Sequence, residues 1–272
     1  MLNILLPTDF SENAQKAIYY AVYLLEREVC KFYFLHAYHD TPSISGNKAD
    51  SRNDLEKLME RVRIENDNPK HYYEIILETD SLLNLINKTV LNIKMDYIFV
   101  GTKGFSTLHE VFMGSNTVDL IKNVHTCPII TVPQTYDYDL PEEIIFASDY
   151  EHYYIEPELA PLINMVKLWD SRLSVVHLHA KKQLTSEQER RKELLKHILK
   201  EVKTKFKEEI IIKSIAYTLQ QLTHENENIG MIALLNTKHS FFQKLLREPV
   251  IKNLTFQTNV PLLVLPQLAE NI

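Results

Sequence analysis

Short apolar runs alternate with amphipathic segments along the whole chain. Residues 2–6 form a continuous apolar run, which is typical of a strand buried on both faces. The segment SENAQKAIYYAVYLLERE follows, and its apolar residues recur at helical spacing. Read in this way, the first half predicts strands at 2–6, 31–37, 72–78, 96–101 and 128–133, helices at 11–28, 54–64, 81–93 and 115–124, and a polar loop at 41–53.

The second half repeats this order of elements. It predicts strands at 143–147, 172–178, 209–215, 229–235 and 260–265, and helices at 155–168, 185–207, 217–226 and 241–254. Three pairs of segments match between the halves: NILLPTD with EIIFASD, FYFLHA with SVVHLHA, and CPIITVP with VPLLVLP. The first pair places Asp9 opposite Asp149. His36 lies 27 residues after Asp9, and His177 lies 28 residues after Asp149. Such self-similarity indicates two copies of one unit.

We therefore predict two domains, at 1–135 and 141–272, joined by the polar, proline-bearing segment QTYDYDLPE. Strands that alternate with helices are typical of βαβ units and a parallel sheet. The predicted fold class is α/β, with two tandem Rossmann-like units, each a mostly parallel five-stranded sheet flanked by helices.

The composition of the chain argues against several classes of binding partner. A net charge of −6 lacks the basic footprint of nucleic-acid-binding proteins and disfavours anionic membrane surfaces. No apolar run reaches the roughly 18–20 residues of a membrane helix, and the N-terminus does not resemble a signal peptide. Two cysteines supply neither a disulfide framework nor a zinc quartet. We expect a cytoplasmic protein with no nucleic-acid and no membrane partner.

Three of the five glycines lie in one short segment, IFVGTKGFSTLHEVFMGSN. Gly101 and Gly104 follow a predicted strand, and Gly114 and Ser115 precede a predicted helix. Glycines at the carboxyl end of a strand let the backbone approach a phosphate, and a helix N-terminus offers free N–H groups to an anion. A turn shaped by glycines and a helix capped by Ser115 would account for the same pattern. The segment contains neither the Walker A motif nor the dinucleotide motif G-x-G-x-x-G.

The segment GTKGFSTLHEVFMGS fits a G-x2-G-x9-G-[ST] signature and resembles the nucleotide-binding universal stress proteins. LLPTDFSENAQKAI, FLHA and CPIITVP resemble that family's opening strand and helix, second strand and closing strand. The resemblance spans nearly the whole chain as a tandem pair and implies an adenine nucleotide alpha hydrolase-like fold. It implies ATP or another adenine nucleotide, with or without Mg²⁺, at the carboxyl edge of the first sheet. The implied nucleotide-binding residues are Pro7, Thr8 and Asp9 near the adenine and ribose, Ala37 at the adenine, Gly101, Gly104, Gly114 and Ser115 at the phosphates and ribose, and Val100 and Asn116 beside the glycines.

Two residues in this region also have ordinary structural explanations. Asp9 follows a buried strand, where its carboxylate can accept a hydrogen bond from a base or a ribose, or cap the helix at 11–13. Both roles can hold together. His36 ends a strand, and a histidine bonded to the backbone is a simpler explanation for it than a catalytic group.

The second half lacks the glycines of this segment. Alignment of the closing strands places Arg247 and Glu248 opposite Gly114 and Ser115, and the best local match places Asn236 and His239 opposite Gly101 and Gly104. Side chains at these positions block close approach of the backbone, and Glu248 would repel a phosphate. We therefore predict one nucleotide site per chain. The alternative is that the second half holds some other anion with Lys238, His239 and Arg247.

The resemblance also implies dimerisation through the last strand. In a tandem chain this predicts either a homodimer or pairing of the strands at 128–133 and 260–265 within the chain. The second half is then a packing partner for the first.

No metal site and no catalytic residue are expected. We expect His177 and His179 to point to opposite sides of their strand, and no H-x3-H pair with a carboxylate is apparent. The leading hypothesis is an ATP-binding stress-response protein, a sensor or regulator. The alternatives are a slow ATP hydrolase or nucleotide transferase that uses Asp9 or His109, and a nucleotide-free interaction or dimerisation module.

Overall fold

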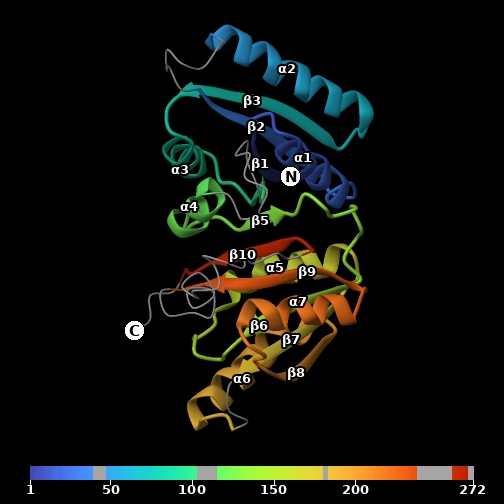
Figure 1. The fold of residues 1–272 in the computed structure, drawn as a ribbon, viewed down its shortest axis with the longest axis vertical. Helices are drawn as coiled ribbons and strands as arrows, with labels where there is room; N and C mark the ends of the chain where they lie inside the picture. The colour runs from blue at the N-terminus through green and yellow to red at the C-terminus, as the bar shows by residue number, and fades with distance from the viewer. Residues whose placement is uncertain (39–46, 103–114, 180–182, 238–258, 269–272) are drawn as a thin grey trace. The chain divides into compact units, whose positions relative to one another are not determined.

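The computed structural model describes residues 1–38, 47–102, 115–179, 183–237 and 259–268 (Figure 1). The chain forms two compact units, the first ending at Gln134 and the second beginning at Thr135. Several sequence-based predictions lie outside the described residues: the helix at 241–254, and Gly104, His109, Gly114, Lys238, His239, Arg247 and Glu248.

In the first unit, strands and helices alternate and each pair of neighbouring strands is parallel. The strands lie in the order β3-β2-β1-β4-β5. The elements are β1 (Leu2–Pro7), α1 (Glu12–Leu24), β2 (Cys30–Tyr38), α2 (Lys48–Glu65), β3 (His71–Thr79), α3 (Leu82–Asn92), β4 (Tyr97–Gly101), α4 (Ser115–Asn123) and β5 (Ile129–Val132).

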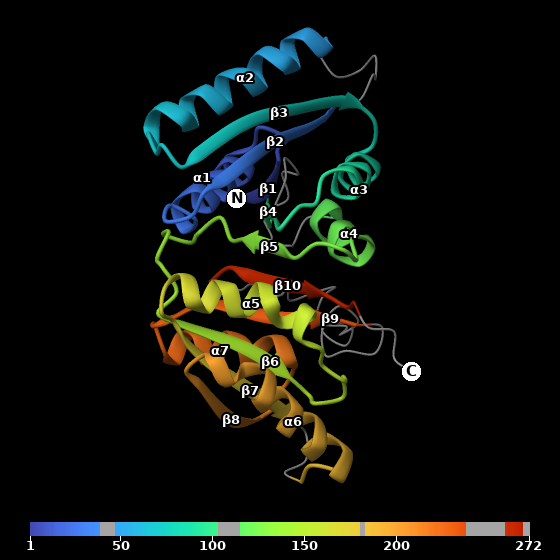
Figure 2. The same cartoon turned by 180° about the vertical axis from the view of Figure 1, so that it is seen from behind.

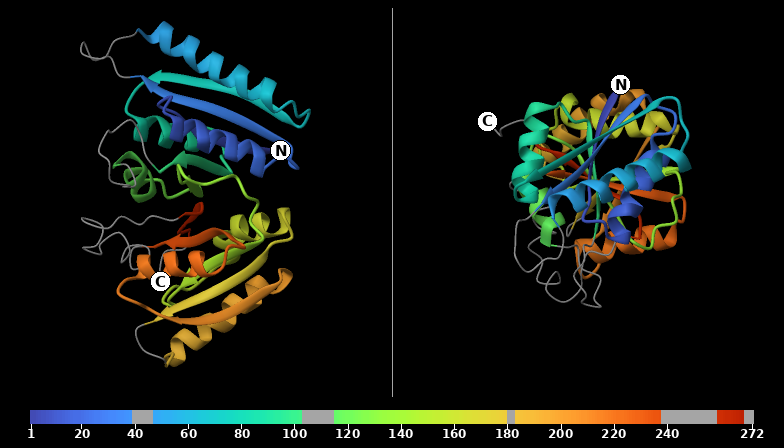
Figure 3. Two further views of the ribbon diagram at one scale, coloured as in Figure 1. Left: turned by 45° about the vertical axis from the view of Figure 1, so that its right-hand side comes forward. Right: turned by 90° about the horizontal axis from the view of Figure 1, so that it is seen from above.

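The strand order reverses between β1 and β4. The chain moves outward from β1 through β2 to β3, returns to β4 beside β1, and continues to β5. Because parallel crossovers are right-handed, α1 and α2 cover one face of the sheet and α3 and α4 cover the other. In agreement, α3 packs beside α4 (Figures 1 and 2), and α2 lies along β2 and β3 (Figure 3).

The second unit has the same topology, with parallel strands in the order β8-β7-β6-β9-β10. Its reversal falls between β6 and β9. The predicted fold class is therefore confirmed for both units. The elements are β6 (Glu143–Ser148), α5 (Glu156–Leu168), β7 (Arg172–His179), α6 (Ser186–Ile198), a 3₁₀ turn (Leu199–Glu201), β8 (Thr204–Ile210), α7 (Ile215–Glu225), β9 (Ile229–Asn236) and β10 (Leu262–Pro266).

Several sequence-based boundaries were wrong. The charged helix predicted at 185–207 ends at Ile198, and the strand predicted at 209–215 is β8, which begins at Thr204. β8 lies at the edge of its sheet and carries charged residues, so its composition matches that of a solvated helix. In the first unit, α2 begins at Lys48, within the predicted loop, because Asn47 and Asp50 form a capping box.

Central strands of both sheets are buried along their length. All eight residues of β9 are buried, as are Ile4, Leu5 and Leu6 of β1. This explains why these strands appear in the sequence as continuous apolar runs rather than alternating ones. No helix among the described residues is both long enough and apolar enough to cross a bilayer.

Gly101 ends β4 at a place where the backbone passes very close to α1. A Cβ atom built at this position would lie 2.7 Å from the carbonyl oxygen of Asn13 and 2.8 Å from its Cγ. The φ angle of Gly101 lies outside the left-handed region, so backbone conformation is not what requires a glycine. The missing side chain instead allows α1 to pack against β4.

We expect Gly101→Ala to lower the free energy of unfolding by about 1–3 kcal/mol, because a methyl group must push β4 and α1 apart. Chemical denaturation checks this, with Lys57→Ala as a control. Lys57 is exposed on α2, and its removal should change stability by less than about 0.5 kcal/mol. Wild-type stability in Gly101→Ala would mean that Asn13 moves aside at little cost.

A buried carboxylate at the start of β6 anchors the second unit. The Glu143 side chain is only 7% exposed, and it accepts hydrogen bonds from Ser174, from Lys207 Nζ at 3.1 Å and from Asn226 Nδ2 at 3.1 Å. Burial by itself raises the pKa of Glu143. The hydrogen bonds and the Lys207 charge outweigh it, so the pKa lies below its ordinary value.

The pKa of Glu143 is lower in the folded state than in the unfolded state. Ionised Glu143 therefore stabilises the fold fully at pH values above its unfolded-state pKa. This contribution is lost as the pH falls through the folded-state pKa. We expect Glu143→Gln to cost about 1–3 kcal/mol at pH 7 and progressively less as the medium is acidified below pH 4. Denaturant titrations across this range measure the difference. Glu201→Gln, at a carboxylate 63% exposed in a surface ion pair, is the control. An effect of Glu143→Gln that does not change with pH would contradict this account.

Candidate functional site

The candidate site lies where the strand order of the first sheet reverses. In open parallel sheets, ligands bind outside the carboxyl ends of the strands at this point. Here β1 ends at Pro7 and β4 ends at Gly101. Pairing of Leu5 with Ile98 brings these two ends to the same edge. The first glycine of the signature therefore stands at the reversal itself.

A tight turn connects β1 to α1. The Asp9 Oδ1 atom accepts hydrogen bonds from Ser11 N at 3.1 Å and Ser11 Oγ at 2.6 Å. Ser11 Oγ in turn accepts from Ala14 N and caps α1. The sequence left open that Asp9 itself caps α1. The structure shows instead that Ser11 is the cap and that Asp9 holds Ser11 in place by two hydrogen bonds. Among the described residues no group bonds to the other carboxylate oxygen, Oδ2.

Thr8 and Phe10 complete this turn. Thr8 Oγ1 accepts from Phe10 N at 2.9 Å, and Phe10 has a φ of 65°, which is unusual for a residue with a side chain. His36 Nδ1 lies 2.8 Å from the carbonyl oxygen of Thr8, and the His36 ring packs on Phe10 at a centroid distance of 4.6 Å. The expectation that His36 bonds to the backbone is confirmed.

The remaining residues implied by the family resemblance differ in how far they are exposed to a ligand. Pro7 and Val100 are buried in the sheet, whereas Ala37, near the end of β2, is half-buried. Ser115 and Asn116 open α4, and Asn116 is exposed. Gly104 and Gly114 lie outside the described residues, so the geometry of the glycine segment stays a prediction.

Sequence reasoning missed one residue that holds this edge together. Thr117, buried in the first turn of α4, donates its hydroxyl to the carbonyl oxygen of Gly101 at 3.0 Å. This bond ties the end of β4 to the start of α4. A lone threonine in a helix carries no sequence signal for such a contact.

The second unit reproduces the turn in detail. Ser148 Oγ accepts from Tyr150 N at 2.9 Å, and Asp149 Oδ1 accepts from Glu151 N at 3.1 Å. Tyr150 has a φ of 54°, and its ring stacks on His177 at 4.6 Å. The two turns thus share an acceptor hydroxyl, an acceptor aspartate, a residue with positive φ and a ring contact to a histidine.

The surroundings of the second turn differ from those of the first. Helix α1 begins three residues after Asp9, whereas α5 begins seven residues after Asp149. The backbone N–H of Ile155 at the start of α5 bonds to the fully buried Glu158 carboxylate at 3.3 Å. A carboxylate of the chain itself therefore occupies this helix N-terminus.

The sheet register also corrects one alignment. Tyr97 pairs with Ile4 in the first unit, and Met231 pairs with the equivalent Ile144 in the second. Counting along the strands, the position of Gly101 is taken by Leu235, one residue before the Asn236 that the sequence match suggested. Leu235 is buried, so the close approach seen at Gly101 has no counterpart there.

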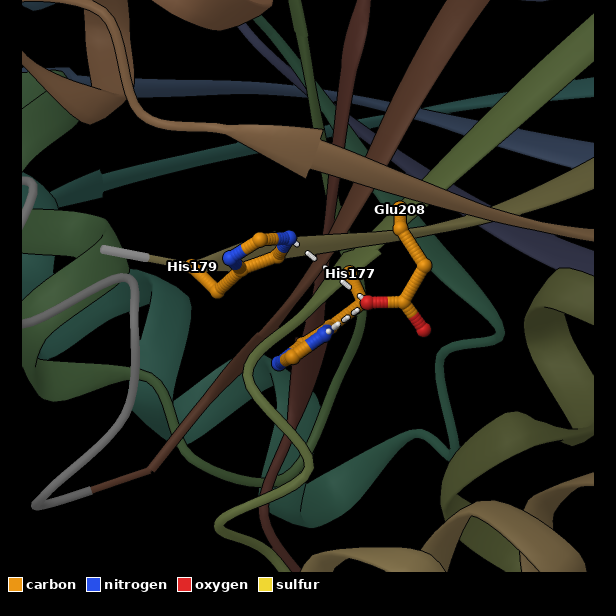
Figure 4. A group of neighbouring side chains, drawn as sticks. All are labelled: His177, His179 and Glu208. Carbon is orange, nitrogen blue, oxygen red and sulfur yellow. Dashed lines mark hydrogen bonds and ion pairs between the residues drawn. The ribbon is translucent and has the colours of Figure 1, made fainter. Parts of the chain in front are cut away.

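The expectation about the two neighbouring histidines was wrong. Residues two apart on a strand share a face, and His177 and His179 lie side by side at a ring-centroid distance of 5.1 Å (Figure 4). Glu208, on the adjacent β8, points between them. Sequence reasoning missed this group because Glu208 fell between the helix predicted at 185–207 and the strand predicted at 209–215, so it was not placed on a strand beside His177.

Comparisons with known proteins agree with this architecture. The model of the Universal stress protein family matches residues 1–133. A universal stress protein from Archaeoglobus fulgidus DSM 4304 is 17% identical, with 97% of this chain and 98% of that chain covered and a TM-score of 0.72. A putative universal stress protein from Pseudomonas aeruginosa UCBPP-PA14 is 14% identical, with 97% and 92% covered and a TM-score of 0.58.

The same fold also serves other proteins. The cytoplasmic domain of a prokaryotic cation chloride cotransporter is 9% identical, with 97% of this chain and 95% of that chain covered and a TM-score of 0.56. No curated protein sequence matches this chain significantly. At these identities the solved structures show the fold of both units, and the family model identifies the first. Residues 1–133 of this chain therefore belong to the universal stress protein family, and the second unit repeats their fold.

Proposed function

We propose that this chain is a stress-response sensor or regulator that binds one adenine nucleotide, ATP or a close relative, in its first unit. One observation carries the proposal: the glycine signature begins at Gly101, where the strand order reverses. This is the position at which open parallel sheets bind ligands. Membership of residues 1–133 in the universal stress protein family supports the same assignment.

Each part of the nucleotide has a proposed partner. The phosphates, with Mg²⁺ where it accompanies them, lie against Gly104, Gly114 and the N-terminus of α4 at Ser115. Asp9 uses its unpartnered Oδ2 to accept a hydroxyl of the ribose or an amino group of the base. The backbone at Ala37 receives the adenine. Cytoplasmic location and pairing through the last strands accompany this proposal as predictions from the sequence.

The second unit is proposed to bind no nucleotide in this manner. Leu235 stands where Gly101 stands in the first unit, and its side chain is buried there. The sequence alignment places Glu248 opposite Ser115. Each of these differences removes a feature that an anion needs.

Calorimetric titration of the full chain with ATP, AMP and cyclic AMP should give one site per chain for at least one of them. Gly114→Arg and Ser115→Glu, which copy residues of the second half, should abolish binding, because they introduce a bulky side chain and a negative charge at the phosphates. Absence of binding at millimolar nucleotide would overturn the proposal in favour of a nucleotide-free interaction module. Two sites per chain would refute the inactive second unit.

Asp9→Asn separates ligand binding from turn structure. An asparagine oxygen still accepts from Ser11 N and Oγ, while the group at Oδ2 becomes a donor. We expect nucleotide affinity to fall roughly 10- to 100-fold, which corresponds to losing one charged hydrogen bond of about 1.5–3 kcal/mol. The melting temperature should stay within a degree or two of wild type. Asp149→Asn is the matched control and should leave affinity unchanged; equal losses in both variants would show that Asp9 does not contact the nucleotide.

A further inference from the structure

We propose that His177, His179 and Glu208 bind a divalent transition-metal ion, for which Zn²⁺ is the best match. The two histidines come from the carboxyl end of β7, and the glutamate comes from β8, where it pairs with His177 in the sheet register. All three donor atoms lie within 4.8 Å of one another (Figure 4). The site belongs entirely to the second unit and does not depend on nucleotide binding in the first.

The donor atoms converge on one point. Glu208 Oε2 lies 2.9 Å from His177 Nδ1 and 3.6 Å from His179 Nε2. Tetrahedral zinc sites, with bonds of about 2.0–2.1 Å to nitrogen and oxygen, place their ligands roughly 3.3 Å apart. The existing distances bracket this value. Since all three donor atoms lie within 4.8 Å of one another, side-chain adjustments of at most about 1.5 Å would place the ion.

Surrounding groups hold the three side chains in place. The His177 ring is sandwiched between Tyr150, at 4.6 Å, and His179, at 5.1 Å. Lys192 Nζ binds the other carboxylate oxygen of Glu208, Oε1, at 2.8 Å and so fixes the direction of Oε2. Outer partners of this kind orient metal ligands in known sites. The histidine side chains are only 3% and 9% exposed, so their positions are set by packing.

The cluster also contains buried polar atoms that the described contacts leave unsatisfied. His179 Nδ1 and the Tyr150 hydroxyl are buried with no hydrogen-bond partner among the described residues. Buried polar atoms without partners point to a polar cluster that something else completes.

The donor set selects the class of ion. Two imidazoles and one carboxylate suit zinc and its late first-row neighbours better than calcium or magnesium, which prefer oxygen ligands. Three protein ligands leave a fourth position free. A pocket lined by Gln183, Leu184 and Glu189 adjoins His179 and Glu208, and water can enter there to complete the coordination.

The first unit provides an internal comparison. The sheet register places His36 opposite Leu77 in the first unit, where His177 lies opposite Glu208 in the second. Two residues further along β2 stands Tyr38 in place of His179. Only the second unit therefore combines the three donors, although both units share the turn and the first histidine.

The test uses the full chain stripped of metal with a chelator. Zn²⁺ affinity is measured by competition with a chromophoric chelator, and Co²⁺ is added as a spectroscopic probe. We expect one Zn²⁺ per chain, visible Co²⁺ absorption bands typical of a tetrahedral site, and a rise in melting temperature with added Zn²⁺. Removing a ligand by His179→Gln or Glu208→Gln should weaken Zn²⁺ binding by at least about 100-fold, since losing even an outer partner costs roughly 10- to 100-fold.

His36→Gln is the matched control, because it removes the equivalent histidine of the first unit, and it should leave Zn²⁺ affinity unchanged. Glu208→Gln keeps the side-chain volume and one of the two acceptor oxygens that Lys192 and His177 use in the wild type. Loss of binding in this variant is assigned to the lost ligand only when its circular dichroism and its stability to denaturant match those of the wild type. Equal Zn²⁺ affinity in wild type and both ligand variants, or no tetrahedral Co²⁺ spectrum in wild type, would overturn the proposal.

Discussion

Right-handed crossovers between parallel strands determine where polar, ligand-binding side chains can lie in this chain. Each sheet is covered by helices and its central strands are buried, so ligand-binding groups are confined to the ends of the strands. The reversal of strand order brings the ends of β1 and β4 together in the first unit, and those of β6 and β9 in the second. Gly101 is where this constraint is tightest, because α1 can pack against β4 only if no Cβ is present. The first glycine of the signature is therefore required by the fold as well as suited to a phosphate.

Comparison of the two units shows which features of the fold occur in both copies. The turn after the first strand keeps its acceptor hydroxyl, its aspartate, its residue with positive φ and its ring contact to a histidine in both copies. In each copy these groups contact one another within the turn, so the shape of the turn is set locally. The start of the helix that follows the turn differs between the two units. It lies four residues later in the second unit, where Glu158 takes over its capping.

Sequence patterns were sufficient for the order of elements and for the repeat, because buried parallel strands and amphipathic helices leave direct signals. They failed at β8, where an edge strand with alternating charged residues has the composition of a solvated helix. That error also hid Glu208 and with it the cluster around His177. The contact of Thr117 with Gly101 and the clash of a Cβ with Asn13 were not predictable, since both depend on how closely a helix approaches a strand. Of the candidate nucleotide residues, those on β1, β2 and β4 were placed at one edge by strand topology alone.

The cluster in the second unit also indicates what kind of metal site it would be. In structural zinc sites the fold depends on the ion, because the free energy of metal binding contributes directly to folding. Here Glu208 already has Lys192 and His177 as partners, so its charge is compensated without a metal. A metal ion would have to break the hydrogen bond between His177 and Glu208 in order to bind both residues. The free-energy cost of losing that hydrogen bond would weaken metal binding. The proposed site would therefore favour reversible occupancy that follows metal concentration over permanent retention.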